Sequence, residues 1–187
     1  MQTLNKQKLP LSLYLYILLW IFFVYLYIQI LFFSAENSQN ILLSGLYFIE
    51  FGVHEASHLV FFFLPSIMTA AAGSIGEISF TILIVAAALK ARSYFAAIFG
   101  CLWVMLAMNS AGRYMADART QQIPLIGPGE VVNHDWNYVF SQLGWLDFDV
   151  LIGATVRGIG DIIGALALIF GLYLIVNKII ADNKDSL

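Results

Sequence analysis

The sequence predicts an all-α membrane protein in which residues 1–187 form a single transmembrane domain, a bundle of about five helices with one irregular interfacial loop. Of the 187 residues, 60% are hydrophobic and only 11% are charged, a composition typical of integral membrane proteins. Long apolar runs recur along the chain, and about 20 apolar residues can cross a hydrocarbon core of roughly 30 Å. We therefore expect membrane lipids as partners, and no nucleic acid, because the sequence contains no basic patch.

The first two expected helices cover residues 11–33 and 41–64. The first run is too long for the roughly 7–15-residue core of a cleaved signal peptide, so we expect it to be retained. The second run would extend about 36 Å at 1.5 Å per residue, which is enough to cross the membrane. Asn40 ends the polar turn between the two runs and is placed to cap the second helix.

The third expected helix covers residues 67–89. Its first half is rich in Ala and Gly, which permits either close helix packing or an unwound, re-entrant segment. We favour the packed helix, because the rest of the run is too short to span the membrane alone. Glu77 in this run is interpreted either as a partner of a histidine or as part of a polar contact between helices.

The fourth expected helix, residues 94–116, ends in a polar stripe in which Asn109, Arg113 and Asp117 recur every four residues. The stripe either faces a functional site or marks a snorkelling helix end with a salt bridge between Arg113 and Asp117. In the loop that follows, residues 118–149, Pro and Gly predict irregular structure, and its aromatic residues predict a short piece at the membrane interface.

The fifth expected helix, residues 150–180, contains Arg157 and Asp161, which we expect to pair because they are four residues apart. With five spans, the basic residues divide equally between the two membrane faces, so the positive-inside rule does not indicate an orientation. Lys90, Arg92, Lys178 and Lys184 would lie on one face, and Lys6, Lys8, Arg113 and Arg119 on the other.

Residues 54–58 carry the chemistry, with a His-Glu-x-x-His pattern that contains two of the three histidines of the chain. On a helix, His54 and His58 lie on one face and could bind one zinc ion. Glu55 would then act as general base on a water at the metal. The alternative is a polar packing cluster without metal, but ionisable groups are costly inside a bilayer, which favours the metal site.

Four residues are candidates for a third ligand, since a catalytic zinc site has three protein ligands and a water. His134 and Asp135 rank first, because five spans place the loop 118–149 on the side where the second helix ends. Asp135 would bind the metal or orient a histidine, or it would cap a helix instead. Asp117 and Asp161 are the less favoured candidates.

Four segments together resemble a family of small bacterial integral membrane proteins of unassigned function, over about residues 45–165. They are the motif at 54–58, Ala-Gly-Ser at 72–74, Ala-Asp-Ala-Arg at 116–119 and His-Asp-Trp-Asn at 134–137. This resemblance implies a location in the bacterial plasma membrane.

The motif within a membrane helix is also similar to that of site-two-type intramembrane zinc metalloproteases. In those enzymes the third ligand is an aspartate from a later helix, in a Leu-Asp-Gly context. Neither Asp147 nor Asp161 stands in that context here. The resemblance implies metal at His54 and His58 and a general base at Glu55.

Three functions are compatible with these residues. The first is a membrane-embedded zinc metallohydrolase that cleaves a peptide bond in a membrane-associated polypeptide. The second is a zinc-dependent hydrolase of a lipid amide or ester. The third is a non-catalytic metal-binding or assembly subunit of a membrane complex, which would be favoured if Glu55 proved dispensable. We favour the first, because the motif has a specific hydrolytic mechanism.

Overall fold

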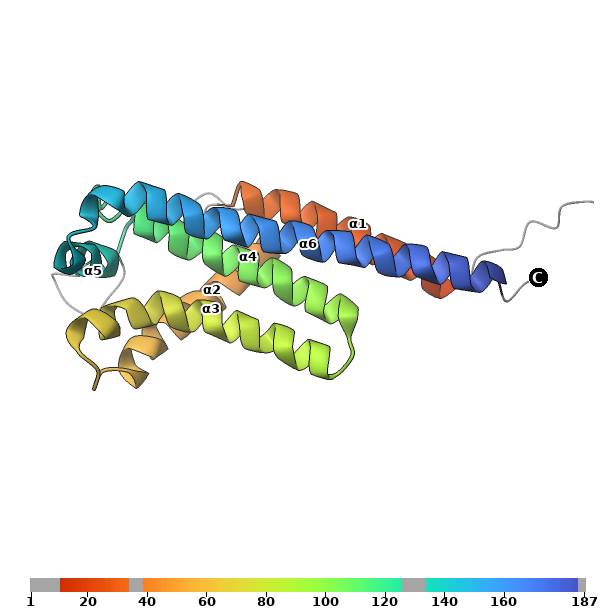
Figure 1. Ribbon diagram of the computed structural model, residues 1–187, viewed down its shortest axis with the longest axis horizontal. Coiled ribbons are helices and arrows are strands. Elements are labelled where there is room, and N and C mark those ends of the chain that lie inside the picture. Colours follow the sequence, from red (N-terminus) through yellow and green to blue (C-terminus); the bar gives the residue numbers. More distant parts are fainter. Residues whose placement is uncertain (1–10, 34–38, 126–133, 185–187) are drawn as a thin grey trace, which may run out of the picture.

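The computed structural model describes residues 11–33, 39–125 and 134–184, and every regular element in these ranges is helical, as predicted. The helices run side by side as an elongated bundle, with α5 at one end (Figure 1). Their bounds are α1 Leu11–Leu31, α2 Ile41–Val60, α3 Ser66–Lys90, α4 Tyr94–Ala116, α5 Asp135–Leu143 and α6 Asp149–Lys184, with a short 3-10 turn at Leu146–Phe148.

Among the described residues, four segments are long and apolar enough to cross a membrane: α1, α3, α4 and Leu146–Asp182, which covers most of α6. The expected count of five is therefore not reached, because α2 is not among them. It has 20 residues, and Glu50 and Glu55 lower its hydropathy. α2 lies obliquely in the half of the bundle that carries α5 (Figure 1).

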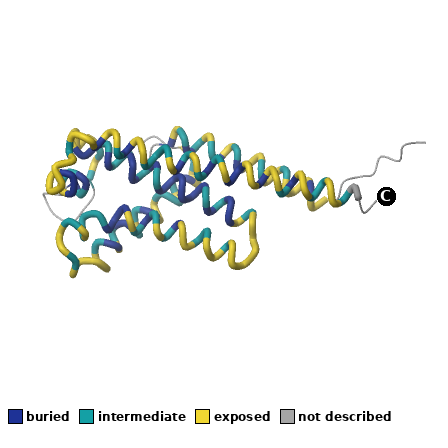
Figure 2. The backbone as a smooth tube through the Cα atoms, viewed as in Figure 1, coloured by how far each residue is buried: buried dark blue, intermediate teal, exposed yellow. Residues whose placement is uncertain are grey.

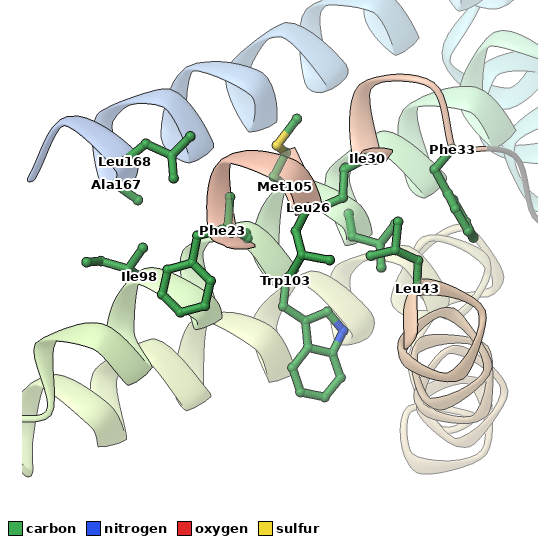
Figure 3. Close-up of a cluster of buried hydrophobic side chains, with 12 residues drawn as sticks. Phe23, Leu26, Ile30, Phe33, Leu43, Ile98, Trp103, Met105, Ala167 and Leu168 are labelled. Atoms are coloured by element: carbon green, nitrogen blue, oxygen red, sulfur yellow. The ribbon is translucent and has the colours of Figure 1, made fainter. Parts of the chain in front are cut away.

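α4 lies at the centre of the bundle. In its most apolar window 61% of the residues are buried, against 17% in that of α1, and Figure 2 shows buried residues along its length. Inside a bilayer such a core is held by van der Waals packing, because lipid tails are as apolar as leucine. The cluster in Figure 3 joins Phe23 and Leu26 of α1, Leu43 of α2, Trp103 and Met105 of α4 and Leu168 of α6.

α2 packs against the first half of α3, which is one continuous helix. The small residues of α3 face α2: a Cβ at Gly73 would collide with the ring of His54, and a Cβ at Gly76 with the side chain of Ser57. The Ala- and Gly-rich sequence thus permits close approach of the two helices. At the start of α2, the side chain of Asn40 accepts a hydrogen bond from the backbone N–H of Leu43 (3.2 Å), as an N-cap does.

The predicted irregular loop, residues 118–149, contains the helix α5, and residues 126–133 within it lie outside the described ranges. The aromatic residues of α5 do not all face the membrane interface: Trp136 and Phe140 are buried, and Trp136 Nε1 donates a hydrogen bond to Ser74 Oγ of α3 (3.0 Å). A tertiary contact with α3, which the local sequence does not reveal, therefore holds α5 inside the bundle.

Candidate metal centre

His54, His58 and Asp135 converge at one point. The Nε2 atoms of both histidines lie 3.4 Å from Oδ2 of Asp135, and the donor atoms of the three residues all lie within 4.8 Å of one another. Two of the residues come from adjacent turns of α2, and the third is the first residue of α5. Two imidazoles and one carboxylate form a ligand set that binds zinc in proteins, and this group could hold a metal ion.

The other nitrogen of each imidazole ring has its own partner. His54 Nδ1 lies 3.4 Å from Oε2 of Glu77, and His58 Nδ1 donates a hydrogen bond to the carbonyl oxygen of Thr69 (2.8 Å). These contacts orient both rings with Nε2 toward Asp135, as is usual for histidines that bind metals. The sequence left open whether Glu77 is a partner of a histidine or part of another polar contact between helices. In the structure Glu77 contacts a histidine, His54.

Tyr114 of α4 positions Asp135. The hydroxyl of Tyr114 donates to Oδ2 of Asp135 (3.2 Å) and accepts a hydrogen bond from the Asp135 backbone N–H (3.1 Å). The Tyr114 ring also lies edge-on to His54, with 6.0 Å between the ring centroids. α4 thereby fixes the first residue of α5 beside α2, although nothing in the sequence around Tyr114 indicates this role.

Asp135 is ionised at neutral pH. Its burial raises the pKa, but the hydrogen bonds and positive charges of His54 and His58 outweigh burial and hold the pKa at about 2. Without metal, the same contacts join the two histidines to Asp135 and Glu77. A divalent cation would replace the histidine protons, because metal binding releases protons from its ligands.

Glu55 is half-buried. Its carboxylate interacts electrostatically with the Tyr114 hydroxyl, which in turn contacts Asp135. Glu55 thus acts by charge on the residue that positions Asp135, and among the described residues it makes no hydrogen bond to the convergent donors.

His134 does not join the convergent group. It is the N-cap of α5: its Nδ1 accepts a hydrogen bond from the Asn137 backbone N–H (3.2 Å), and its Nε2 lies 3.7 Å from Oδ2 of Asp117. Burial lowers the pKa of His134, although Asp117 opposes this shift. The sequence offered a helix cap as an alternative role for Asp135, but the residue that caps α5 is His134.

Asp117 and Asp161, the less favoured candidates, also lie outside the group. The carboxylate of Asp117 accepts hydrogen bonds from the Thr120 hydroxyl and from the backbone N–H groups of Gln122 and Ile123. These bonds hold its pKa below the usual value despite the effect of burial. Asp161 Oδ1 instead accepts a hydrogen bond from Asn109 Nδ2 (2.8 Å).

A groove leads from the convergent donors to the surface at this end of the bundle. Its volume is about 840 Å³, within the range of ligand-binding clefts. Polar, uncharged side chains and a few apolar ones form most of its walls. The lining residues are His58, Phe62, Leu64, Ser66, Thr69, Ala70, Gln121, His134, Asp135, Asn137, Tyr138 and Ser141.

The sequence matches no protein-family model, and neither a curated protein nor a solved structure is similar to it. The site is therefore interpreted from its own geometry.

Proposed function

We propose that this protein is a membrane-embedded zinc metallohydrolase that cleaves a peptide bond in a membrane-associated polypeptide. The observation that carries the proposal is the convergence of His54, His58 and Asp135, and Glu55 follows His54 in the His-Glu-x-x-His pattern. Three protein ligands leave one position of a tetrahedral zinc site open for water or substrate. This combination is typical of hydrolytic rather than purely structural zinc sites.

The ligand set fits zinc in its donor types and in its supporting contacts. A zinc ion at this site would supply a Lewis acid and would lower the pKa of a water molecule. Glu55 accepts a proton from the attacking water, whose oxygen forms a bond to the substrate carbonyl carbon. As the C–N bond breaks, Glu55 returns the proton to the amine nitrogen. Glu77 and Thr69 keep the histidine rings in place throughout.

The groove supports a polypeptide as the substrate. Its walls contain hydroxyl and amide groups that could hydrogen-bond an extended backbone, and no lysine or arginine is among the described residues that line it. A phospholipid head group would be expected to need such a basic residue. A zinc-dependent lipid amide or ester hydrolase is for this reason the second candidate.

One observation favours the third candidate, a non-catalytic metal-binding or assembly subunit of a membrane complex. The contacts among Glu77, His54, Asp135 and His58 join α2, α3 and α5, so the cluster also has a structural role. Dispensability of Glu55 would favour this candidate over hydrolysis.

We further propose an arrangement in the bacterial plasma membrane. In this arrangement α1, α3, α4 and α6 cross the membrane in alternating directions (Figure 1). The helix α2 also belongs to the bundle but enters the membrane only partly. This arrangement makes the positive-inside rule informative. Among the described residues, the basic residues at the end away from the metal centre, which would face the cytoplasm, are Lys90, Arg92, Lys178 and Lys184, against Arg113 and Arg119 at the end that carries it.

The orientation can be tested with single cysteines in a chain whose native Cys101 is replaced by serine. A membrane-impermeant maleimide should label a cysteine at Gln121 in intact cells, and a cysteine at Lys90 only after lysis. The opposite labelling pattern would reverse the orientation without affecting the metal centre.

The catalytic proposal is tested by Glu55→Gln. The variant should retain zinc, because Glu55 is not a ligand, while turnover falls about 10²–10⁴-fold. The measurement is accumulation of uncleaved membrane polypeptides in cells with Glu55→Gln, compared with wild type and His54→Ala. If His54→Ala changes these polypeptides and Glu55→Gln does not, the metal matters but hydrolysis does not.

A further inference from the structure

Two arginines lie close together between α4 and α6. Arg113 and Arg157 are both half-buried, and their guanidinium charges are near enough to repel each other. The helices approach closely at this level: a Cβ at Gly112 would lie 2.6 Å from both Arg157 Cγ and the Gly153 carbonyl oxygen. Glycines thus allow α4 and α6 to bring the two arginines together.

Each arginine has an aspartate four residues later, the usual spacing of a helical salt bridge, and neither salt bridge forms. Asp117, which follows Arg113, accepts hydrogen bonds from Thr120 and two backbone N–H groups. Asp161, which follows Arg157, is bound by Asn109. The expected pairing of Arg157 with Asp161 is therefore wrong.

Asn109 separates Arg157 from its aspartate. Its Nδ2 donates to Asp161 Oδ1 (2.8 Å), and its Oδ1 accepts a hydrogen bond from Arg157 Nε (3.4 Å). Among the described residues, the ion pairs made by arginines all belong to Arg119. Arg113 and Arg157 therefore carry two adjacent positive charges that no described carboxylate neutralises, and such half-buried charges favour a bound anion.

The depth of the pair in the membrane indicates the source of the anion. Arg113 lies one turn before the end of α4, and Arg157 lies about 12 Å into α6 at 1.5 Å per residue, within reach of the surface for a long side chain. Phospholipid phosphates occupy this level. Guanidinium groups at this level can bind a phosphate through charge-assisted hydrogen bonds.

We propose that Arg113 and Arg157 bind the phosphate head group of an anionic phospholipid at the α4–α6 crossing. The shared phosphate would contact both guanidinium groups, since arginine binds phosphate with two parallel hydrogen bonds. This proposal rests on the membrane location of α4 and α6. It does not depend on zinc or on hydrolysis.

The experiment uses the full-length protein in detergent, titrated separately with phosphatidylglycerol, phosphatidylcholine and inorganic phosphate at equal phosphate concentration. Phosphatidylglycerol should raise the unfolding midpoint of the wild type by about 5 °C near saturation, and native mass spectrometry should show one retained lipid. Arg113→Gln and Arg157→Gln should each weaken this binding about fivefold or more. The matched control Lys90→Gln removes an exposed charge at the other end of the bundle and should bind like the wild type.

The lipid-free midpoints give a second measurement. Arg113→Gln should be at least as stable as the wild type without lipid, because the substitution relieves repulsion between the guanidinium groups and removes no described hydrogen bond, whereas Arg157→Gln also loses the bond to Asn109. A clear loss of lipid-free stability in Arg113→Gln would indicate a hidden carboxylate partner and overturn the proposal. Equal lipid binding by wild type and both variants would also overturn it. An equal shift with inorganic phosphate would assign the pair to a free anion instead of a lipid.

Discussion

Glu77 Oε2 lies 3.4 Å from Nδ1 of His54, the ring nitrogen that does not face Asp135. A carboxylate in this position fixes the ring orientation and increases the basicity of the metal-binding nitrogen. We predict that Glu77→Gln weakens zinc affinity about 10–100-fold without abolishing the site. Zinc competition with a chelator would measure this change in purified protein.

Glu50 provides the matched control for this prediction. It is fully buried on α2, one turn before His54, and among the described residues its carboxylate makes no hydrogen bond to His54, His58 or Asp135. Glu50→Gln should leave zinc affinity nearly unchanged. If both variants lose zinc equally, burial of acids in general, and not the contact with His54, explains the effect.

Asp135 and His134 are neighbours with different predicted roles. Asp135→Asn should release zinc, because its Oδ2 is the atom that both histidine Nε2 atoms face. His134→Ala should keep most of the zinc but lose about 1 kcal/mol of stability, since it removes the cap of α5. Metal content and unfolding midpoints of both purified variants would separate the roles, and zinc loss in His134→Ala with retention in Asp135→Asn would reverse them.

The pKa of Asp135 predicts an acid transition in the metal-free protein. The folded pKa, about 2, lies below the ordinary value of 3.8, so Asp135 stabilises the fold above about pH 4. This stabilisation, about 2 kcal/mol, should disappear as the pH falls from 4 to 2. Unfolding midpoints of the zinc-free wild type should decline over this range. The decline should be flatter in Asp135→Asn, and parallel curves would show that other acids cause it.

Gly73 leaves the space that the ring of His54 occupies. Gly73→Ala should displace the ring, weaken zinc binding and destabilise the fold by about 1–3 kcal/mol. Gly52→Ala is the matched control on α2, because its Cβ would meet no atom within 4 Å. The control should be neutral or should stabilise the helix by up to about 1 kcal/mol. Equal metal content in the two variants would contradict the proposed role of Gly73.

The helical class and the candidate histidines could be predicted from the sequence because both depend on local properties. Long apolar runs predict helices whatever their partners are, and a spacing of four places His54 and His58 on one face of any helix. The number of membrane spans was less predictable. The acids of α2 lower its hydropathy, so α2 is not among the candidate spans. α1 and α3 run in opposite directions (Figure 1), so the chain can cross the membrane in α1 and return in α3 without a further crossing by α2.

Only the tertiary structure decided which other residues meet the histidines. His134 and Asp135 are adjacent in sequence, but their side chains have different partners. The side chain of His134 caps α5 at the backbone N–H of Asn137, whereas Tyr114 holds the side chain of Asp135 beside α2. Likewise, Arg157 and Asp161 have the spacing of a salt bridge, yet Asn109 from another helix binds the aspartate. Each outcome depends on how helices from distant parts of the chain cross, and local periodicity contains no information about those crossings.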